Sequence, residues 1–146
     1  FRGSEATADQ TQQLRKVKTK NALVYYEGRV VVSGIYHKKI RESEIGNFEA
    51  GQICFDVKGP SAKLIPREND SRSPWFCFSN SAEANAAFKI PSATPDGTCR
   101  IVGTATIQIS KYVVNRVESE VHDVARLDKV INSTAATFKA ECGFYQ

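Results

Sequence analysis

Alternating apolar and polar residues predict that most of this chain forms β-strands. In the segment 52–57, apolar side chains occupy every second position, which is the period of a strand with one buried face. The same period runs through 101–109, so we expect a long strand there, kinked near Gly103. The run 75–78 is the most aromatic of the chain, and 62–65 is a candidate for a further short strand. The chain is therefore predicted to be mainly β.

Two runs near the beginning of the chain predict one long, coiled strand. Residues 22–26 and 29–36 are rich in β-branched and aromatic side chains, which fit a pleated surface. Gly28 and Gly34 lie within this stretch, and a glycine inside a strand often marks a bulge or a sharp bend. We therefore expect this strand to bend, as strands do at the corner of a barrel.

Two other segments have the periodicity of helices. The alanine-rich stretch 81–88 follows three residues of the N-cap type at 79–81, and prolines and a glycine come after it. We expect a helix of about two turns there. In 118–130, apolar residues recur at helical spacing, which favours a helix in the middle of this segment. A short strand at 127–131 is the rival interpretation.

The ends of the chain are less patterned. Residues 1–20 are mostly polar, which predicts a flexible lead-in or a short helix over about 8–18. A tether is the functional interpretation of this segment, and a frayed terminus is the simpler one. The tail 132–146 is poor in strand signals. Because 146 residues fit one domain, we expect residues 21–146 to form a single β-barrel domain after the lead-in.

The order of these elements resembles the OB-fold, a five-stranded Greek-key barrel with a short helix. In this resemblance 81–88 is the helix, and it follows the aromatic strand 75–78. The stretch 29–34 looks like the strand that opens small bacterial OB-type domains, and 99–105 looks like the strand after their helix. The resemblance extends over about 22–131 without a diagnostic motif. It implies a five-stranded OB-like Greek-key barrel with one short helix and a second helix or strand near the C-terminus.

Four cysteines indicate the compartment. They are Cys54, Cys77, Cys99 and Cys142, and no CxxC pair occurs, which disfavours a zinc ribbon or a thioredoxin-like site. Of the three pairings we favour Cys54–Cys77 with Cys99–Cys142, because the second bridge would tie down the C-terminal tail. Two disulfides indicate a periplasmic or secreted protein. Four buried thiols in a cytosolic protein are the alternative.

Processing and charge add two weaker expectations. The chain contains no Met, so we expect that a signal peptide was removed, or that residues 1–4 are left over from recombinant expression. A net charge of +4 weakly favours anionic lipid, polysaccharide or nucleic acid as a partner. No apolar run approaches the roughly 20 residues of a membrane span, so we expect none.

The sequence motifs of catalysis and metal binding are missing. The chain has two histidines, His37 and His122, and neither GxSxG nor HExxH occurs. His122 precedes Asp123, but adjacent side chains on a helix point in different directions. Acidic residues gather at 42–49 and 118–128, where a solvated face is a simpler interpretation than an acid–base pair. We therefore expect no enzymatic activity, no metal and no cofactor.

Aromatic and basic residues on strands and loops form the candidate binding surface. OB-type proteins stack bases or sugars on the aromatic residues of a strand face, while basic side chains follow phosphates. Alternation places Trp75 and Cys77 on one face of their strand and Phe76 and Phe78 on the other, so one pair should belong to the core. The candidate ligand-binding residues are Tyr36, Lys38, Lys39, Arg41, Lys63, Arg67, Arg72 and Trp75.

These observations favour a secreted or periplasmic, non-enzymatic protein that acts by docking to another protein. The alternative is an OB-type binder of single-stranded nucleic acid or oligosaccharide through its aromatic and basic strand face. Nucleic acid is the less expected of these ligands, because a disulfide-forming compartment rarely offers it. A polyanion or a glycan is a further candidate partner, and the sequence does not indicate an oligomeric state.

Overall fold

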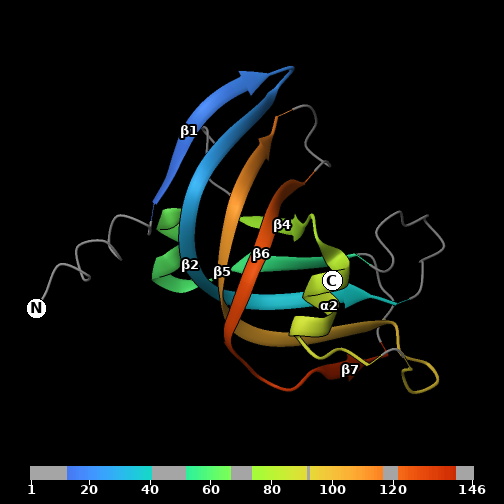
Figure 1. Ribbon diagram of the computed structural model, residues 1–146. Helices are drawn as coiled ribbons and strands as arrows, with labels where there is room; N and C mark the ends of the chain where they lie inside the picture. Colours follow the sequence, from blue (N-terminus) through green and yellow to red (C-terminus); the bar gives the residue numbers. More distant parts are fainter. Residues whose placement is uncertain (1–12, 41–51, 67–73, 92, 117–121, 141–146) are drawn as a thin grey trace, which may run out of the picture.

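The structure is a computed structural model (Figure 1), and strands make up 62 % of the residues that it describes. The described residues are 13–40, 52–66, 74–91, 93–116 and 122–140. The strands are β1 (Gln13–Lys20), β2 (Leu23–Lys39), β3 (Ile53–Val57), β4 (Trp75–Phe78), β5 (Arg100–Asn115), β6 (Asp123–Ser133) and β7 (Thr137–Lys139). The 3₁₀-helix η1 (Gly59–Leu64) follows β3, and the α-helix α2 (Ser81–Ala87) follows β4. Neither of these two helices has the length and hydropathy needed to cross a membrane.

The strands form one mixed sheet that closes on itself. The strand order is β1-β2-β3-β4-β6-β5-β7, and β2 also pairs with β5. The ring therefore runs from β2 through β3, β4, β6 and β5 back to β2, while β1 and β7 are attached outside it. The pairing of β4 with β6 is parallel, and the other pairings are antiparallel. The ring is not formally a barrel, and the prediction of a mainly β fold is confirmed.

The long strand β2 makes the closure of the ring possible. It has 17 residues and pairs with β1, β3 and β5. At Gly34 the backbones of β2 and β3 lie so close that a Cβ atom at this position would be 1.9 Å from the carbonyl oxygen of Asp56. A side chain cannot fit there, so the glycine permits the contact between the two strands. The expected long strand is confirmed, and its register against β5 shifts between Tyr25 and Arg29, where Gly28 has a φ of 106°.

A single cluster of buried side chains fills the interior of the ring. The inward positions of β5 alternate as the sequence predicts, with buried residues at every second position from Ile101 to Ile109. Aromatic rings form the centre of the cluster, where Tyr36 stacks on Phe88 with their ring centroids 4.2 Å apart. Phe76 packs edge-on against both Phe78 and Tyr112. Of the two alternating pairs of side chains on β4, Phe76 and Phe78 are therefore the pair that belongs to the core.

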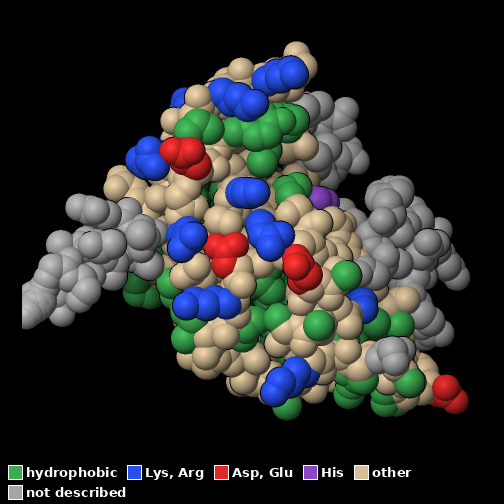
Figure 2. Space-filling model, in the orientation of Figure 1, with side chains coloured by type: hydrophobic (Ala, Val, Ile, Leu, Met, Phe, Trp, Pro, Cys, Tyr) green, Lys and Arg blue, Asp and Glu red, His purple; other side chains and the backbone are tan. Residues whose placement is uncertain are grey.

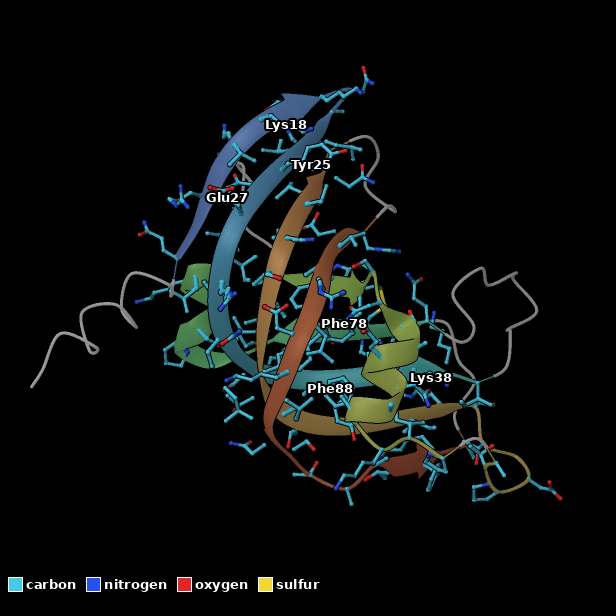
Figure 3. The ribbon with its side chains drawn as sticks, viewed as in Figure 1. Lys18, Tyr25, Glu27, Lys38, Phe78 and Phe88 are labelled. Carbon is cyan, nitrogen blue, oxygen red and sulfur yellow. A yellow bond between two sulfur atoms is a disulfide. The ribbon has the colours of Figure 1, made fainter. Side chains whose placement is uncertain are left out.

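The helix α2 confirms the prediction for 81–88 and is anchored to β6 (Figures 1 and 3). Asn80 occupies the N-cap position, but its side chain does not cap the helix. The Asn80 amide donates to the carbonyl oxygen of Leu127 at 2.9 Å, and the Leu127 backbone N–H donates to Asn80 Oδ1 at 2.9 Å. The side chain thus pairs with β6 as a neighbouring strand would, and this fixes the start of the helix against the ring.

The expectation of a flexible lead-in or a short helix over about 8–18 does not hold for the part of this segment that the structure describes. Residues 13–20 form β1, which pairs with β2 through a two-residue turn at Asn21 and Ala22. Both turn residues have positive φ angles, 53° and 70°, as a type I′ hairpin turn requires. The lysine-rich strand has little apolar signal of its own, and its pairing with β2 overrides that composition. Residues 1–12 lie outside the described residues.

Three further predictions for single elements need correction. Residues 62–64 of the expected strand belong to η1, which begins with a glycine and a proline suited to the first turn of a helix, and Ile65 is its C-cap. The helix favoured within 118–130 is wrong for the described part, where β6 pairs with both β4 and β5, so the rival strand interpretation is the better one. Residues 118–121 lie outside the described residues. The tail contributes β7, which pairs with the beginning of β5.

The predicted Cys54–Cys77 disulfide is confirmed. The two cysteines are register partners on the antiparallel strands β3 and β4. Cys99 is also disulfide-bonded, and no described cysteine is free. Cys142, the predicted partner of Cys99, lies outside the described residues. The bridge between β3 and β4 lies on the side of these strands that faces away from the aromatic core.

Candidate functional site: the Trp75 surface

The predicted ligand-binding residues that the structure describes do not form one surface. Tyr36 is buried in the core, where its hydroxyl donates to the carbonyl oxygen of Thr134 at 3.3 Å. Burial raises the pKa of the Tyr36 phenol above its ordinary value of 10.0. Because its ring stacks on Phe88, this side chain supports the ring of strands and is not placed to meet a ligand at the outer surface.

The predicted cationic residues lie on separate elements. Lys38 is half-buried beside α2, and its ammonium group donates to Asn85 Oδ1 at 2.5 Å (Figure 3). The Asn85 amide in turn donates to the carbonyl oxygen of Ile90 at 3.1 Å, so Lys38 helps to fix the end of the helix. Lys39 is half-buried at the end of β2, and Lys63 is exposed on η1. The predicted residues Arg41, Arg67 and Arg72 lie outside the described residues.

Trp75 is the predicted site residue that lies on an outer face with other groups able to recognise a ligand. Its half-buried indole ring lies 5.8 Å from the imidazole ring of His122, measured between the ring centroids. Asp56 is its register partner on β3. The Asp56 carboxylate lies 3.7 Å from Nε2 of His37, which makes an ion pair when the imidazole is protonated. We call His37, Asp56, Trp75 and His122 the Trp75 surface.

Strand alternation explains why these four side chains face outward together. On β4 the two phenylalanines point into the core, so Trp75 points away from it. On β3 the residues Ile53, Phe55 and Val57 point inward, which turns Asp56 outward. His122 immediately precedes β6, and the parallel register of β6 with β4 brings it beside Trp75.

The chemistry of the Trp75 surface is suited to recognition. An indole offers a large apolar face and one N–H donor, and each imidazole can donate or accept a hydrogen bond. The carboxylate of Asp56 adds an acceptor close to both His37 and Trp75. In the part of the chain that the structure describes, no group of three or more His, Cys, Asp or Glu side chains could hold a metal ion.

Three members of this surface were not among the predicted ligand-binding residues. Alternation along β3 could have identified Asp56, because its apolar neighbours at 55 and 57 mark the opposite face. His122 could not be placed in the same way, since its position depends on the long-range parallel pairing of β6 with β4. His37 follows Tyr36 on β2 and faces outward for the same reason that Tyr36 faces inward.

Comparisons with protein-family models, with curated proteins and with solved structures gave no match for this chain.

Proposed function

We propose that this chain is an extracytoplasmic, non-enzymatic binding module with an OB-type fold, and that it docks to another protein through the Trp75 surface. The connectivity of the ring supports the fold. The strands β2, β3 and β4 are consecutive and antiparallel, and the chain then returns through β5 to lie beside β2. This is the order of a Greek key, and α2 lies between the third and fourth strands of the ring.

In an OB-type fold, one face of the ring is the expected ligand-binding face. OB-folds bind their ligands on the face of their second and third strands and on the adjoining loops. The second and third strands of this ring are β3 and β4, which carry Asp56 and Trp75. The expected ligand face of the fold and the cluster of outward recognition groups therefore coincide.

The placement of Trp75 carries the proposal. Tryptophan is enriched among the residues that dominate binding energy in protein interfaces, where a central aromatic ring is typically surrounded by polar groups. Trp75 is half-buried on an outer face and is bordered by His122 on one side and Asp56 on the other. A partner that covers this indole would bury apolar area and offer hydrogen bonds to the polar rim.

The disulfide supports the proposed compartment. Structural disulfides form and persist in the periplasm and outside the cell, whereas the cytosol keeps most thiols reduced. The Cys54–Cys77 bridge joins the two strands that carry the Trp75 surface. An oxidising compartment would therefore preserve the geometry of the binding face.

Photo-crosslinking tests the proposed docking directly. Benzoylphenylalanine replaces Trp75 in the full chain, which is then irradiated in the native extracellular or envelope fraction. A matched control carries the same group at Gln108, which is also half-buried and lies on β5. We expect one discrete protein adduct from position 75 and none from position 108. Equal labelling from both positions, or no adduct from position 75, would contradict the proposal.

Oligosaccharide or single-stranded nucleic acid is the second candidate ligand, because Trp75 lies on the face that OB-folds use for such chains. Trp75 is the single tryptophan of the chain, so its fluorescence reports on this surface alone. We expect titration with neutral oligosaccharides and with oligo-thymidylate to leave the emission unchanged. Saturable quenching by either ligand would favour this second function over protein docking.

A further inference from the structure

The net charge of the protein is concentrated in one hairpin. The segment 13–29 contains five cationic side chains and one carboxylate, Glu27, which gives it a net charge of +4. The whole chain also has a formal net charge of +4, so the remaining residues balance to zero. We call the paired part of β1 and β2 the basic ribbon, and its cations are Arg15, Lys16, Lys18, Lys20 and Arg29, all of them exposed.

The register of the basic ribbon places most of these cations on one face. Arg15 lies opposite Glu27, Lys18 opposite Tyr25, and Lys20 opposite Leu23. The residues between these positions on β2, Val24 and Tyr26, are buried, so the cationic face is the outer one. Arg29 shares this face, and Lys16 lies on the other, opposite Tyr26.

The ribbon cannot neutralise its own charge. Arg15 forms a salt bridge with Glu27, with 2.9 Å between Arg15 Nη2 and Glu27 Oε2. Glu27 is the single acidic residue of the segment, which leaves an excess of four positive charges. Figure 2 shows Lys and Arg side chains over the ribbon at the top of the molecule, and further basic and acidic side chains lower on the same face. Such a concentration of one sign of charge attracts a polyanion.

The shape of the ribbon favours a linear anion over a flat one. Among the described strands β1 is hydrogen-bonded to β2 alone, and the two strands extend away from the helix α2 and β7 (Figure 1). Side chains two positions apart on one strand face are separated by about 7 Å, so Lys18 and Lys20 form a row along the ribbon. A row of cations matches a chain with repeated negative charges.

The aromatic and apolar residues of the ribbon bear on whether a nucleic acid or a membrane surface would bind there. The Lys18 ammonium lies over the ring of Tyr25, 5.0 Å from its centroid, so this ring face is not open for stacking a base (Figure 3). Binding to a membrane surface scales with the apolar area that inserts into it. Leu23 and Tyr25 on the outer face are half-buried, and Val17, at the bulge of β1, is the one large apolar side chain of the described ribbon that is exposed.

We infer that the basic ribbon binds a linear acidic polysaccharide. Its carboxylate or sulfate groups would pair with Lys18, Lys20 and Arg29, and binding would not depend on the Trp75 surface. The interaction is electrostatic, so the affinity should fall steeply with salt as bound counterions are exchanged.

The test measures binding of the full chain to fluorescently labelled heparin and to polygalacturonate at low salt. The double variant K18E/K20E is compared with K89E/K139E, which makes the same change in net charge at exposed Lys89 and at Lys139 in β7, away from the ribbon. We expect K18E/K20E to bind at least one polysaccharide tenfold or more weakly, while K89E/K139E stays within twofold of the native protein. If K18E/K20E does not fold, K18Q/K20Q takes its place with the same expected direction.

The same titration includes oligo-thymidylate and vesicles of phosphatidylglycerol and phosphatidylcholine. Tighter binding of either of these than of both polysaccharides would overturn the inference. It would also be overturned by equal losses in the two double variants, or by no binding of either polysaccharide at low salt.

Discussion

A glycine and a tyrosine lie opposite each other in the core, where the tyrosine ring occupies the space of both side chains. Gly103 on β5 lies opposite Tyr36 on β2, and a Cβ atom at position 103 would lie 2.4 Å from the phenol of Tyr36. The tyrosine ring therefore fills the volume that a side chain at position 103 would need. The sequence predicts a kink at Gly103, and in the structure a glycine is needed there because Tyr36 leaves no room for a side chain.

Replacing Gly103 with alanine should consequently destabilise the protein. The added methyl group overlaps buried atoms of a ring held between two strands, and overpacking of this kind typically costs about 1–3 kcal/mol. Urea unfolding followed by circular dichroism would measure the change in the free energy of unfolding. The control is Val102→Ala, a half-buried outward position on the same strand, for which we expect a smaller loss. Equal stability of Gly103→Ala and the native protein would contradict this packing.

Tyr36 also predicts how stability depends on alkaline pH. Burial raises the pKa of its phenol in the folded protein above the ordinary value of 10.0, so the unfolded chain loses this proton first as the pH rises. The contribution of the protonated Tyr36 phenol to the free energy of unfolding is fully present below pH 10 and decreases above it. We expect the native protein to lose stability more steeply than Tyr36→Phe in thermal unfolding as the pH rises above 10. Parallel curves for the two proteins would contradict the assignment.

Among the elements, the helix α2 is held to β6 by the side chain of Asn80, which bonds to the β6 backbone as a neighbouring strand would. The Asn80 amide makes both hydrogen bonds that the backbone of Leu127 would otherwise make to a neighbouring strand. Ala84 and Phe88 then pack into the core from the helix. The position of α2 is therefore set by β6 as well as by the apolar face of the helix.

Asn80→Ala should destabilise the protein by about 1–3 kcal/mol, because it leaves the N–H and carbonyl groups of Leu127 without these partners. Ser81→Ala is the control, since that serine makes one hydrogen bond of 3.3 Å to the carbonyl oxygen of Phe78. We expect a smaller loss for Ser81→Ala in chemical denaturation. A loss for Asn80→Ala that does not exceed that of the control would show that the pairing with β6 contributes little.

The elements also show what the sequence could and could not predict. β3, β5 and α2 followed from periodicity, because each packs one regular face against the core. β1 and β6 did not, since their polar or helix-like patterns are overridden by pairing with distant strands. The same limit applies to the site. Trp75 was predicted from its aromatic strand, whereas the neighbourhood of His122 depends on a parallel pairing that no local pattern encodes.

At the scale of the whole molecule, the two proposed binding surfaces lie on different parts of the sheet. The Trp75 surface lies over β2, β3, β4 and the start of β6, and the basic ribbon is formed by β1 and the first part of β2. The strand β2 contributes to both, because its 17 residues are paired along their whole length. The proposed docking surface and the proposed polyanion site are therefore separate, so binding at one would not block the other.

The disulfide should contribute to the stability of the whole molecule through the unfolded chain. Cys54 and Cys77 are 23 positions apart, and closing a loop of this length restricts the unfolded state by about 3 kcal/mol. We expect the double variant C54A/C77A to lose about 2–4 kcal/mol of unfolding free energy in urea. A change below about 1 kcal/mol would show that the bridge is not a main stabilising element.

The affinity of the partner captured from position 75 tests the central claim most directly. Its dissociation constant would be measured for the native protein, for Trp75→Ala and for Gln108→Ala, a half-buried position on β5 outside the Trp75 surface. Trp75→Ala should weaken binding at least about tenfold, which corresponds to about 1.4 kcal/mol, while Gln108→Ala should leave it unchanged. A dissociation constant for Trp75→Ala equal to that of the native protein would contradict the assignment of function to the Trp75 surface.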